Sequence, residues 1–199
     1  MKSLMKNSLV LLIVVLMFGA CGGNQSDTEY PKPRGYFRID LPEKEYQWFD
    51  TTWPFAFKYP VYAEMQPVKT PDAEPYWFNI IYPQFHGMLS FSYKKIEGEN
   101  TLYKLSEEAR EFANKHIIKA NEIIERRVDV FENNVHGVIY EIEGTNTASP
   151  YQFFLSDSTT HFIRAALYFN HLPNNDSISP IIQRVKEDMD TLISTLRWH

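Results

Sequence analysis

The sequence predicts a single α+β domain in which an antiparallel β-sheet packs against two amphipathic helices. Short segments that alternate apolar and polar residues, or are rich in β-branched and aromatic residues, occur in two groups. Each group is followed by a longer segment whose apolar residues recur at three- and four-residue steps, the spacing of an amphipathic helix. Turn-forming residues separate neighbouring strand segments, and strands joined by short turns pair antiparallel.

The first group of strands precedes the first helical segment. Its members are residues 36–41, 55–59, 77–82 and 88–93. Residues 83–87 begin with proline and end with glycine, so we expect a hairpin between the last two strands. Residues 60–75 contain four prolines, which lack the backbone N–H that a sheet requires, and they predict a loop.

The first helix is predicted from an apolar stripe. The stripe consists of Leu102, Leu105, Ala109, Phe112, Ala113, Ile117 and Ala120. Asn100 or Thr101 is the expected N-terminal cap, because both side chains can accept a hydrogen bond from the first helical turn. The nearby glutamates fall outside the stripe, so they are expected to face solvent rather than to form an acid–base pair.

The second group of strands follows, and a second helix closes the chain. The strand segments are residues 123–130, 138–142, 151–155 and 161–170. Residues 156–160 have the composition of a hairpin turn. Ser179 is expected to cap the second helix, with Pro180 at its first position. The apolar stripe of this helix consists of Ile182, Val185, Met189, Leu192, Ile193 and Leu196.

The first 21 residues have the pattern of a secretory signal. Lys2 and Lys6 form a positive n-region, and the apolar run that follows is too short for a permanent membrane-spanning helix. Small residues precede Cys21, so residues 1–20 are interpreted as a lipoprotein signal peptide and Cys21 as the acylated mature N-terminus. The alternatives are an ordinary signal peptide, or a short anchor in which Cys21 is incidental.

The next part of the chain is predicted to be a tether. Residues 21–34 comprise the lipidated cysteine and a small, polar, proline-bearing segment, and residues 35–199 form the globular domain. At about 3.3 Å per residue, the tether could hold the domain up to about 40 Å from the lipid.

Composition limits the function classes open to this chain. The formal net charge is −5 and becomes −7 when Lys2 and Lys6 leave with the signal, so the domain lacks the basic surface of a nucleic-acid-binding protein. Cys21 is the single cysteine, which excludes disulfides within the domain, thiolate metal sites and thiol redox chemistry. Packing alone must therefore stabilise the fold.

The sequence contains no signature of a known enzyme class, such as a phosphate loop, a dinucleotide fingerprint or a nucleophile elbow. The six histidines lack the spacing of a metal site, so we expect neither a metal nor a cofactor. His116 is expected to flank the core. Residues 156–158 with His161 nearby are the best nucleophilic candidates, but serine and aspartate in a hairpin turn are explained by bonds to the backbone. We therefore expect no catalytic residues.

Aromatic residues crowd the start of the domain. Ten of them fall between residues 30 and 59. A single pair of strands cannot point all ten side chains into the core. Tyrosine and tryptophan dominate interface hot spots, so we expect partner-binding residues among Tyr36, Tyr46, Trp48 and Trp53. The alternative is that these side chains form one edge of an aromatic-rich core.

Several segments resemble the gliding motility lipoprotein GldD family of Bacteroidetes. They are residues 31–39 (PKPRGYFRI), 77–80 (WFNI), 148–154 (ASPYQFF), 157–164 (DSTTHFIR), 166–170 (ALYFN) and 196–198 (LRW). The resemblance covers nearly the whole chain after the signal, and a signal that ends in Cys21 agrees with it. The order of elements also resembles the Mog1/PsbP-type fold, whose members are mostly binding or assembly factors.

The resemblance implies a non-enzymatic cell-envelope lipoprotein that is needed for gliding and for the linked type IX secretion machinery. Its implied partners are the membrane, other gliding lipoproteins and type IX secretion components, and Cys21 is the one position with an implied chemical role. Gly22 and Gly23 replace the acidic run associated with surface export in this phylum, so the periplasmic face of the outer membrane is expected. Thr51 and Ser158 follow aspartates in a pattern that resembles the O-glycosylation sequon of the phylum, although such pairs are also common in turns.

A different class of function remains open. The chain could be a small envelope ligand-binding lipoprotein or hydrolase, with a pocket between the sheet and residues 60–75. A deep apolar pocket with convergent polar groups would favour this alternative, whereas a flat aromatic patch would favour partner binding.

Overall fold

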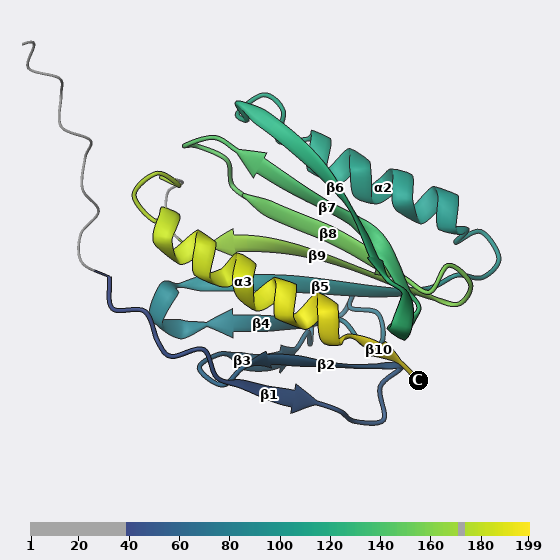
Figure 1. Ribbon diagram of the computed structural model, residues 1–199. Helices are drawn as coiled ribbons and strands as arrows, with labels where there is room; N and C mark the ends of the chain where they lie inside the picture. Colours follow the sequence, from purple (N-terminus) through teal and green to yellow (C-terminus); the bar gives the residue numbers. More distant parts are fainter. Residues whose placement is uncertain (1–38, 171–173) are drawn as a thin grey trace, which may run out of the picture. The chain divides into compact units, whose positions relative to one another are not determined.

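Two antiparallel sheets and two α-helices form the part of the chain that the computed structural model describes, residues 39–170 and 174–199 (Figure 1). The larger sheet has the strand order β3-β4-β5-β9-β8-β7-β6, and the smaller has the order β1-β2-β10. The strands of the larger sheet are β3 (Glu64–Pro67), β4 (Phe78–Tyr82), β5 (Gly87–Lys95), β6 (Glu122–Val130), β7 (Val135–Glu143), β8 (Tyr151–Ser156) and β9 (His161–Phe169). The smaller sheet contains β1 (Tyr46–Phe49), β2 (Phe55–Pro60) and β10 (Arg197–Trp198).

The predicted fold class is confirmed, because the helices α2 (Leu102–Asn114) and α3 (Ser179–Thr195) pack on opposite faces of the larger sheet. Alternation along β8 shows how the strands serve both faces. Phe153 and Leu155 enter the core that contains α3 and β2, whereas Phe154 enters the core that contains α2. Every strand of the sheet pairs antiparallel with its neighbours, including β5 and β9, which are distant in sequence.

Both predicted hairpins are present. β4 and β5 pair across the 3₁₀ turn η1 (Pro83–Phe85), and β8 and β9 pair across residues 157–160. Another 3₁₀ turn, η2 (Phe131–Asn133), joins β6 to β7. Each 3₁₀ turn ends on a residue in the left-handed region, His86 with φ 48° and Asn134 with φ 52°. These turns fix the register of β4 with β5 and of β6 with β7.

The first helix begins as predicted but ends early. The Thr101 hydroxyl accepts a hydrogen bond from the Lys104 N–H over 3.2 Å, so Thr101 is the N-cap. The predicted continuation of the apolar stripe to Ala120 is wrong. The helix ends at Asn114. Turns whose hydrogen bonds mostly span three residues follow and lead the chain to β6, and Ile117 in these turns is 63% exposed.

Three further predictions about local structure are wrong. Residues 39–41 do not form a strand, and the rest of the predicted strand 36–41 lies outside the described residues. The predicted loop 60–75 contains β3, which lies beside β4 at the edge of the sheet and ends at Pro67, as an edge strand tolerates proline. Ser179 is the first residue of α3 rather than its cap; Ile178 is the cap residue and makes no capping side-chain bond.

Two segments of the smaller sheet were not predicted as strands. β1 pairs with one edge of β2, and β10, directly after α3, pairs with the other.

Neither α2 nor α3, the helices of the described residues, is long and apolar enough to cross a membrane.

Candidate functional site

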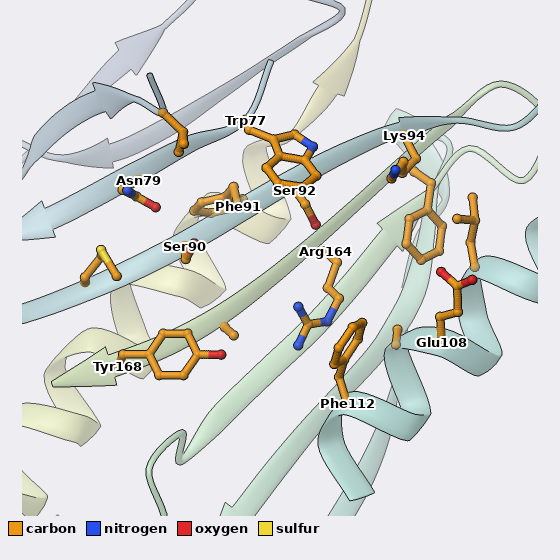
Figure 2. A pocket seen from close by; sticks show the side chains of 16 residues that line it. Trp77, Asn79, Ser90, Phe91, Ser92, Lys94, Glu108, Phe112, Arg164 and Tyr168 are labelled. Carbon is orange, nitrogen blue, oxygen red and sulfur yellow. The ribbon is translucent and has the colours of Figure 1, made fainter. Parts of the chain in front are cut away.

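A pocket of about 520 Å³ opens on the larger sheet beside α2 (Figure 2). α2 contacts β8 and β9 and leaves the adjoining surface of β4 and β5 uncovered on the same face. The pocket is lined by Val68, Trp77, Asn79, Met88, Ser90, Phe91, Ser92, Lys94, Leu105, Glu108, Ala109, Phe112, Phe162, Arg164, Ala166 and Tyr168. A concave, largely apolar site with few polar groups is the usual form of a ligand pocket.

The floor of the pocket consists of small side chains on three neighbouring strands. Ser90 on β5 pairs with Asn79 on β4 and with Ala166 on β9. Ser92 on β5 pairs with Arg164 on β9. Because serine and alanine rise little above the sheet, they leave room that larger side chains would fill.

Arg164 is the charged group at the centre of this site. Its guanidinium carbon lies 4.3 Å from the centre of the Phe112 ring, and its Nη2 donates a hydrogen bond to Gln152 Oε1 over 2.7 Å. Burial lowers the pKa of Arg164, and the neighbouring Tyr168 hydroxyl opposes this shift. Within the described residues, no carboxylate forms an ion pair with Arg164. The cation is therefore held by neutral groups and an aromatic ring.

Buried polar atoms without hydrogen-bond partners cluster around Arg164. They include Arg164 Nε, Asn79 Oδ1 and Gln152 Nε2. Native proteins leave few such atoms, because each forfeits its hydration without a replacement bond. Their concentration on one face of the sheet marks this region as a candidate binding site.

The rim of the pocket carries charges of both signs. Lys94 pairs with Glu74 and lies 5.8 Å from the centre of the Trp77 ring. Glu108 projects from α2, one helical turn before Phe112 (Figure 2). Val68 is the one lining residue from the segment 60–75, so the pocket lies mainly beside α2 rather than beneath that segment.

The predicted partner-binding residues occupy different environments. Tyr36 lies outside the described residues. The Tyr46 hydroxyl donates to Asp188, and the Trp53 ring makes edge contacts with four aromatic rings of the core edge, those of Phe49, Phe55, Tyr76 and Phe78. Trp48 is 43% exposed, with Lys58 and Arg197 against its ring at 5.3 and 4.1 Å. Of the three described residues, only Trp48 presents much of its ring to solvent.

The polar groups of the β8–β9 turn serve the backbone. Asp157 Oδ1 accepts hydrogen bonds from three backbone N–H groups, those of Thr159, Thr160 and His161, and the Ser156 hydroxyl accepts one from Ser158. His161 Nδ1 shares a 2.8 Å hydrogen bond with the Tyr93 hydroxyl, and its ring stacks on Trp198. These contacts give Asp157 and His161 structural roles in and beside the turn.

Cys21 lies outside the described residues. His116 is half-buried in the turn after α2, where burial, Arg164 and Lys119 lower its pKa. Thr51 and Ser158 are exposed, and Ser158 has a φ of 71°. Within residues 39–170 and 174–199, no three side chains of histidine, cysteine, aspartate or glutamate are grouped as metal ligands.

Sequence reasoning did not predict the pocket residues as a site. Phe112 was placed in the buried stripe of its helix, yet it is 42% exposed and covers Arg164. The one available signal was Arg164 itself, a full charge in the middle of an apolar strand segment.

Comparisons with known proteins place these observations in a family. No curated protein matches the chain. Among solved structures, the solution structure of cyanobacterial PsbP (CyanoP) from Synechocystis sp. PCC 6803 has a TM-score of 0.48 and 14% identity, covering 82% of this chain and 98% of that one. A likeness at this level says nothing about function. The model of the gliding motility lipoprotein GldD matches residues 26–198, the greater part of the chain. The chain therefore belongs to the GldD family of gliding motility lipoproteins.

Proposed function

We propose that this lipoprotein is non-enzymatic and supports the assembly or stability of the gliding and type IX secretion machinery. The family match over residues 26–198 carries the proposal, because it covers nearly everything after the predicted signal. A single acidic domain without a nucleotide-binding motif suits a supporting role rather than that of a motor. The structural roles of Asp157 and His161 agree with a protein that does not catalyse a reaction.

The proposed attachment is an acyl anchor, including palmitate, on Cys21. Residues 22–34 would then act as a tether with a reach of about 40 Å. We place the domain on the periplasmic face of the outer membrane, because Gly22 and Gly23 follow the cysteine instead of acidic residues.

The surface around Trp48 is the proposed contact with other gliding lipoproteins or type IX secretion components. The Lys58 and Arg197 side chains pack against the exposed Trp48 indole. The indole is therefore already restrained, and little of its side-chain entropy would be lost on binding. Tryptophan and arginine are also the residues most enriched among interface hot spots. We call Trp48, Lys58 and Arg197 the Trp48 surface.

Co-purification of the native lipidated protein from mildly solubilised membranes tests this proposal. We expect other gliding lipoproteins or type IX secretion subunits to be recovered reproducibly with the native form. Cys21→Ala should abolish their recovery if lipid anchoring places the protein beside them. Trp48→Ala should reduce recovery, whereas Phe131→Ala, which removes another exposed aromatic ring, should not.

Two results would contradict the proposal. Recovery of the native form alone would exclude a stable assembly role. Equal recovery with Trp48→Ala and with the native form would show that the partner binds elsewhere.

Thr51 and Ser158 are proposed as O-glycosylation sites because both are exposed and each directly follows an aspartate. Intact-mass measurement of the mature protein from its native host tests this. We expect added hexose mass that Thr51→Val or Ser158→Ala reduces. A mass equal to that of the acylated polypeptide would rule the modification out.

A specific observation favours a second candidate function, ligand binding in the envelope. The pocket beside α2 combines an apolar lining with Arg164, a cation that no described carboxylate neutralises. A hydrolase has no comparable support, because Asp157 is engaged by the backbone of the β8–β9 turn and His161 by the Tyr93 hydroxyl.

A further inference from the structure

The electrostatics of the pocket beside α2 are unbalanced at Arg164. Its guanidinium donates a hydrogen bond to the neutral Gln152 amide, and the Tyr168 side chain lies nearby. A cation withdrawn from water gains most from a nearby anion, and none of the described carboxylates pairs with it. An anionic group entering the pocket would supply the missing partner.

The guanidinium is also held in place before any ligand arrives. Phe112 covers one face of it at 4.3 Å, and the 2.7 Å bond to Gln152 fixes its Nη2 edge. A planar guanidinium presents its donors as a fork, which matches the two oxygens of a carboxylate. Little side-chain entropy would be lost on binding.

The rest of the pocket suits an apolar group. Trp77, Met88 and Phe162 are among the apolar residues that line it. A volume of about 520 Å³ lies within the ordinary range of small-molecule sites. A short aliphatic chain or an aromatic ring would bury apolar surface here and gain the corresponding free energy.

The charges on the rim limit the ligand to a single negative charge. Lys94 is neutralised by Glu74, so it adds little attraction. Glu108 lies on α2 near Phe112 and would repel a dianion such as a phosphate monoester more than a monoanion (Figure 2).

From these observations we propose that the pocket binds a carboxylate attached to an apolar or aromatic group, with the carboxylate at Arg164. The source could be a free organic acid or the C-terminal carboxylate of a polypeptide that ends in an apolar residue. The proposal is independent of the Trp48 surface, and its failure would leave the co-purification experiment unaffected.

Titration of the full-length lipidated protein in micelles of a neutral detergent tests the proposal. The probes are 3-phenylpropionate and its neutral counterpart 3-phenylpropanol, together with the tetrapeptide Gly-Ser-Gly-Phe as free acid and as C-terminal amide. Binding is followed by the indole N–H resonance of Trp77, which lines the pocket and is assigned with Trp77→Phe. We expect saturable shifts with the two carboxylates and much weaker shifts with the alcohol and the amide.

Four variants locate the carboxylate. Arg164→Gln should weaken binding of the acids by at least about tenfold, because a charge-assisted bond is lost, and Arg164→Lys should weaken it less. Glu108→Gln should tighten binding by about two- to fivefold by removing a like charge. Arg110→Gln removes a positive charge from the same helix outside the pocket, and it should leave affinity unchanged.

The proposal is supported if the protein binds the carboxylates in preference to the alcohol and the amide, and if Arg164→Gln removes this preference while Glu108→Gln strengthens it. Tighter binding of the tetrapeptide than of 3-phenylpropionate assigns a polypeptide source, and the reverse order assigns a free acid. Equal binding of acid and alcohol, or no saturable shift with any probe, overturns it. If Arg164→Gln fails to fold, the proposal is tested by whether Glu108→Gln tightens binding of the two carboxylates.

Discussion

The Tyr46 hydroxyl donates a 2.9 Å hydrogen bond to Asp188 Oδ1 and so joins β1 to α3 across 142 positions of sequence. The Tyr62 hydroxyl donates to the second oxygen of the same carboxylate. Asp188 is only 1% exposed, and burial raises its pKa above the ordinary value, although both hydroxyls and Arg184 act to lower it. Two phenols therefore hold an acidic group inside the core, where an unpaired carboxylate would be strongly disfavoured.

Removal of one of these donors should destabilise the fold in a pH-dependent way. We expect Tyr62→Phe to lower the free energy of unfolding by about 1–3 kcal/mol near neutral pH. Since the folded-state pKa of Asp188 lies above its ordinary value of 3.8, its stabilising contribution is complete below that value and is lost as pH rises through the folded pKa. Tyr62→Phe raises that pKa further, so its deficit should be larger at about pH 7 than at about pH 4.

Urea denaturation at both pH values measures this deficit. Tyr59→Phe is the control, because its hydroxyl makes no hydrogen bond with another described residue. A deficit for Tyr62→Phe that is the same at both pH values would show that Asp188 does not titrate in response to this bond.

Asp157 should give the opposite dependence on pH. Burial raises its pKa, but hydrogen bonds from the backbone N–H groups of residues 159–161 and from the Thr159 hydroxyl outweigh burial, so the pKa lies below 3.8. Its contribution is therefore present above 3.8 and is lost as pH falls through the folded pKa. We expect Asp157→Asn to destabilise by about 1–3 kcal/mol near pH 7 and by clearly less near pH 2. Denaturation at both pH values checks this, with the exposed Asp72→Asn as control; equal losses at the two values would contradict it.

Gly137 allows β7 to approach β8 closely. A Cβ added there would lie 1.9 Å from the Phe154 carbonyl oxygen, so the backbone itself would have to move. We expect Gly137→Ala to destabilise by about 3 kcal/mol or more, because overpacking against a central strand has no flexible side chain to absorb it. Gly98→Ala is the comparison: its Cβ meets no atom within 4 Å, and only a positive φ opposes it, at about 1 kcal/mol. Thermal denaturation that ranks the two equally would disprove the steric explanation.

The two tryptophans at the start of the domain should separate stability from binding. Trp53 contacts four aromatic rings, so Trp53→Ala should cost about 2–4 kcal/mol of stability. Trp48 lies mainly against Lys58 and Arg197, so Trp48→Ala should cost about 1 kcal/mol or less. Chemical denaturation measures both. A large loss for Trp48→Ala would mean that its ring is structural, and the co-purification result for that variant would have to be reinterpreted.

Local chemistry made several elements predictable. The apolar and aromatic segments 88–93 and 151–155 identified β5 and β8, and the Thr101 cap identified the start of α2. β1, β3 and β10 escaped prediction because they are two to four residues long and depend on a neighbouring strand for their hydrogen bonds. The same is true of the end of α2, where the route to β6 overrides an apolar pattern that continues to Ala120.

The sequence by itself determined the α+β class, the two hairpins and the family, because periodicity, turn residues and motif segments are local properties of the chain. Only the tertiary structure decided which aromatic side chains are core and which are surface, since Trp48 and Trp53 differ in their distant neighbours rather than in their type. The pocket likewise depends on the tertiary structure. It brings Arg164 of β9, Phe112 of α2 and Asn79 of β4 to one face, and their shared environment arises only when strands distant in sequence pair side by side.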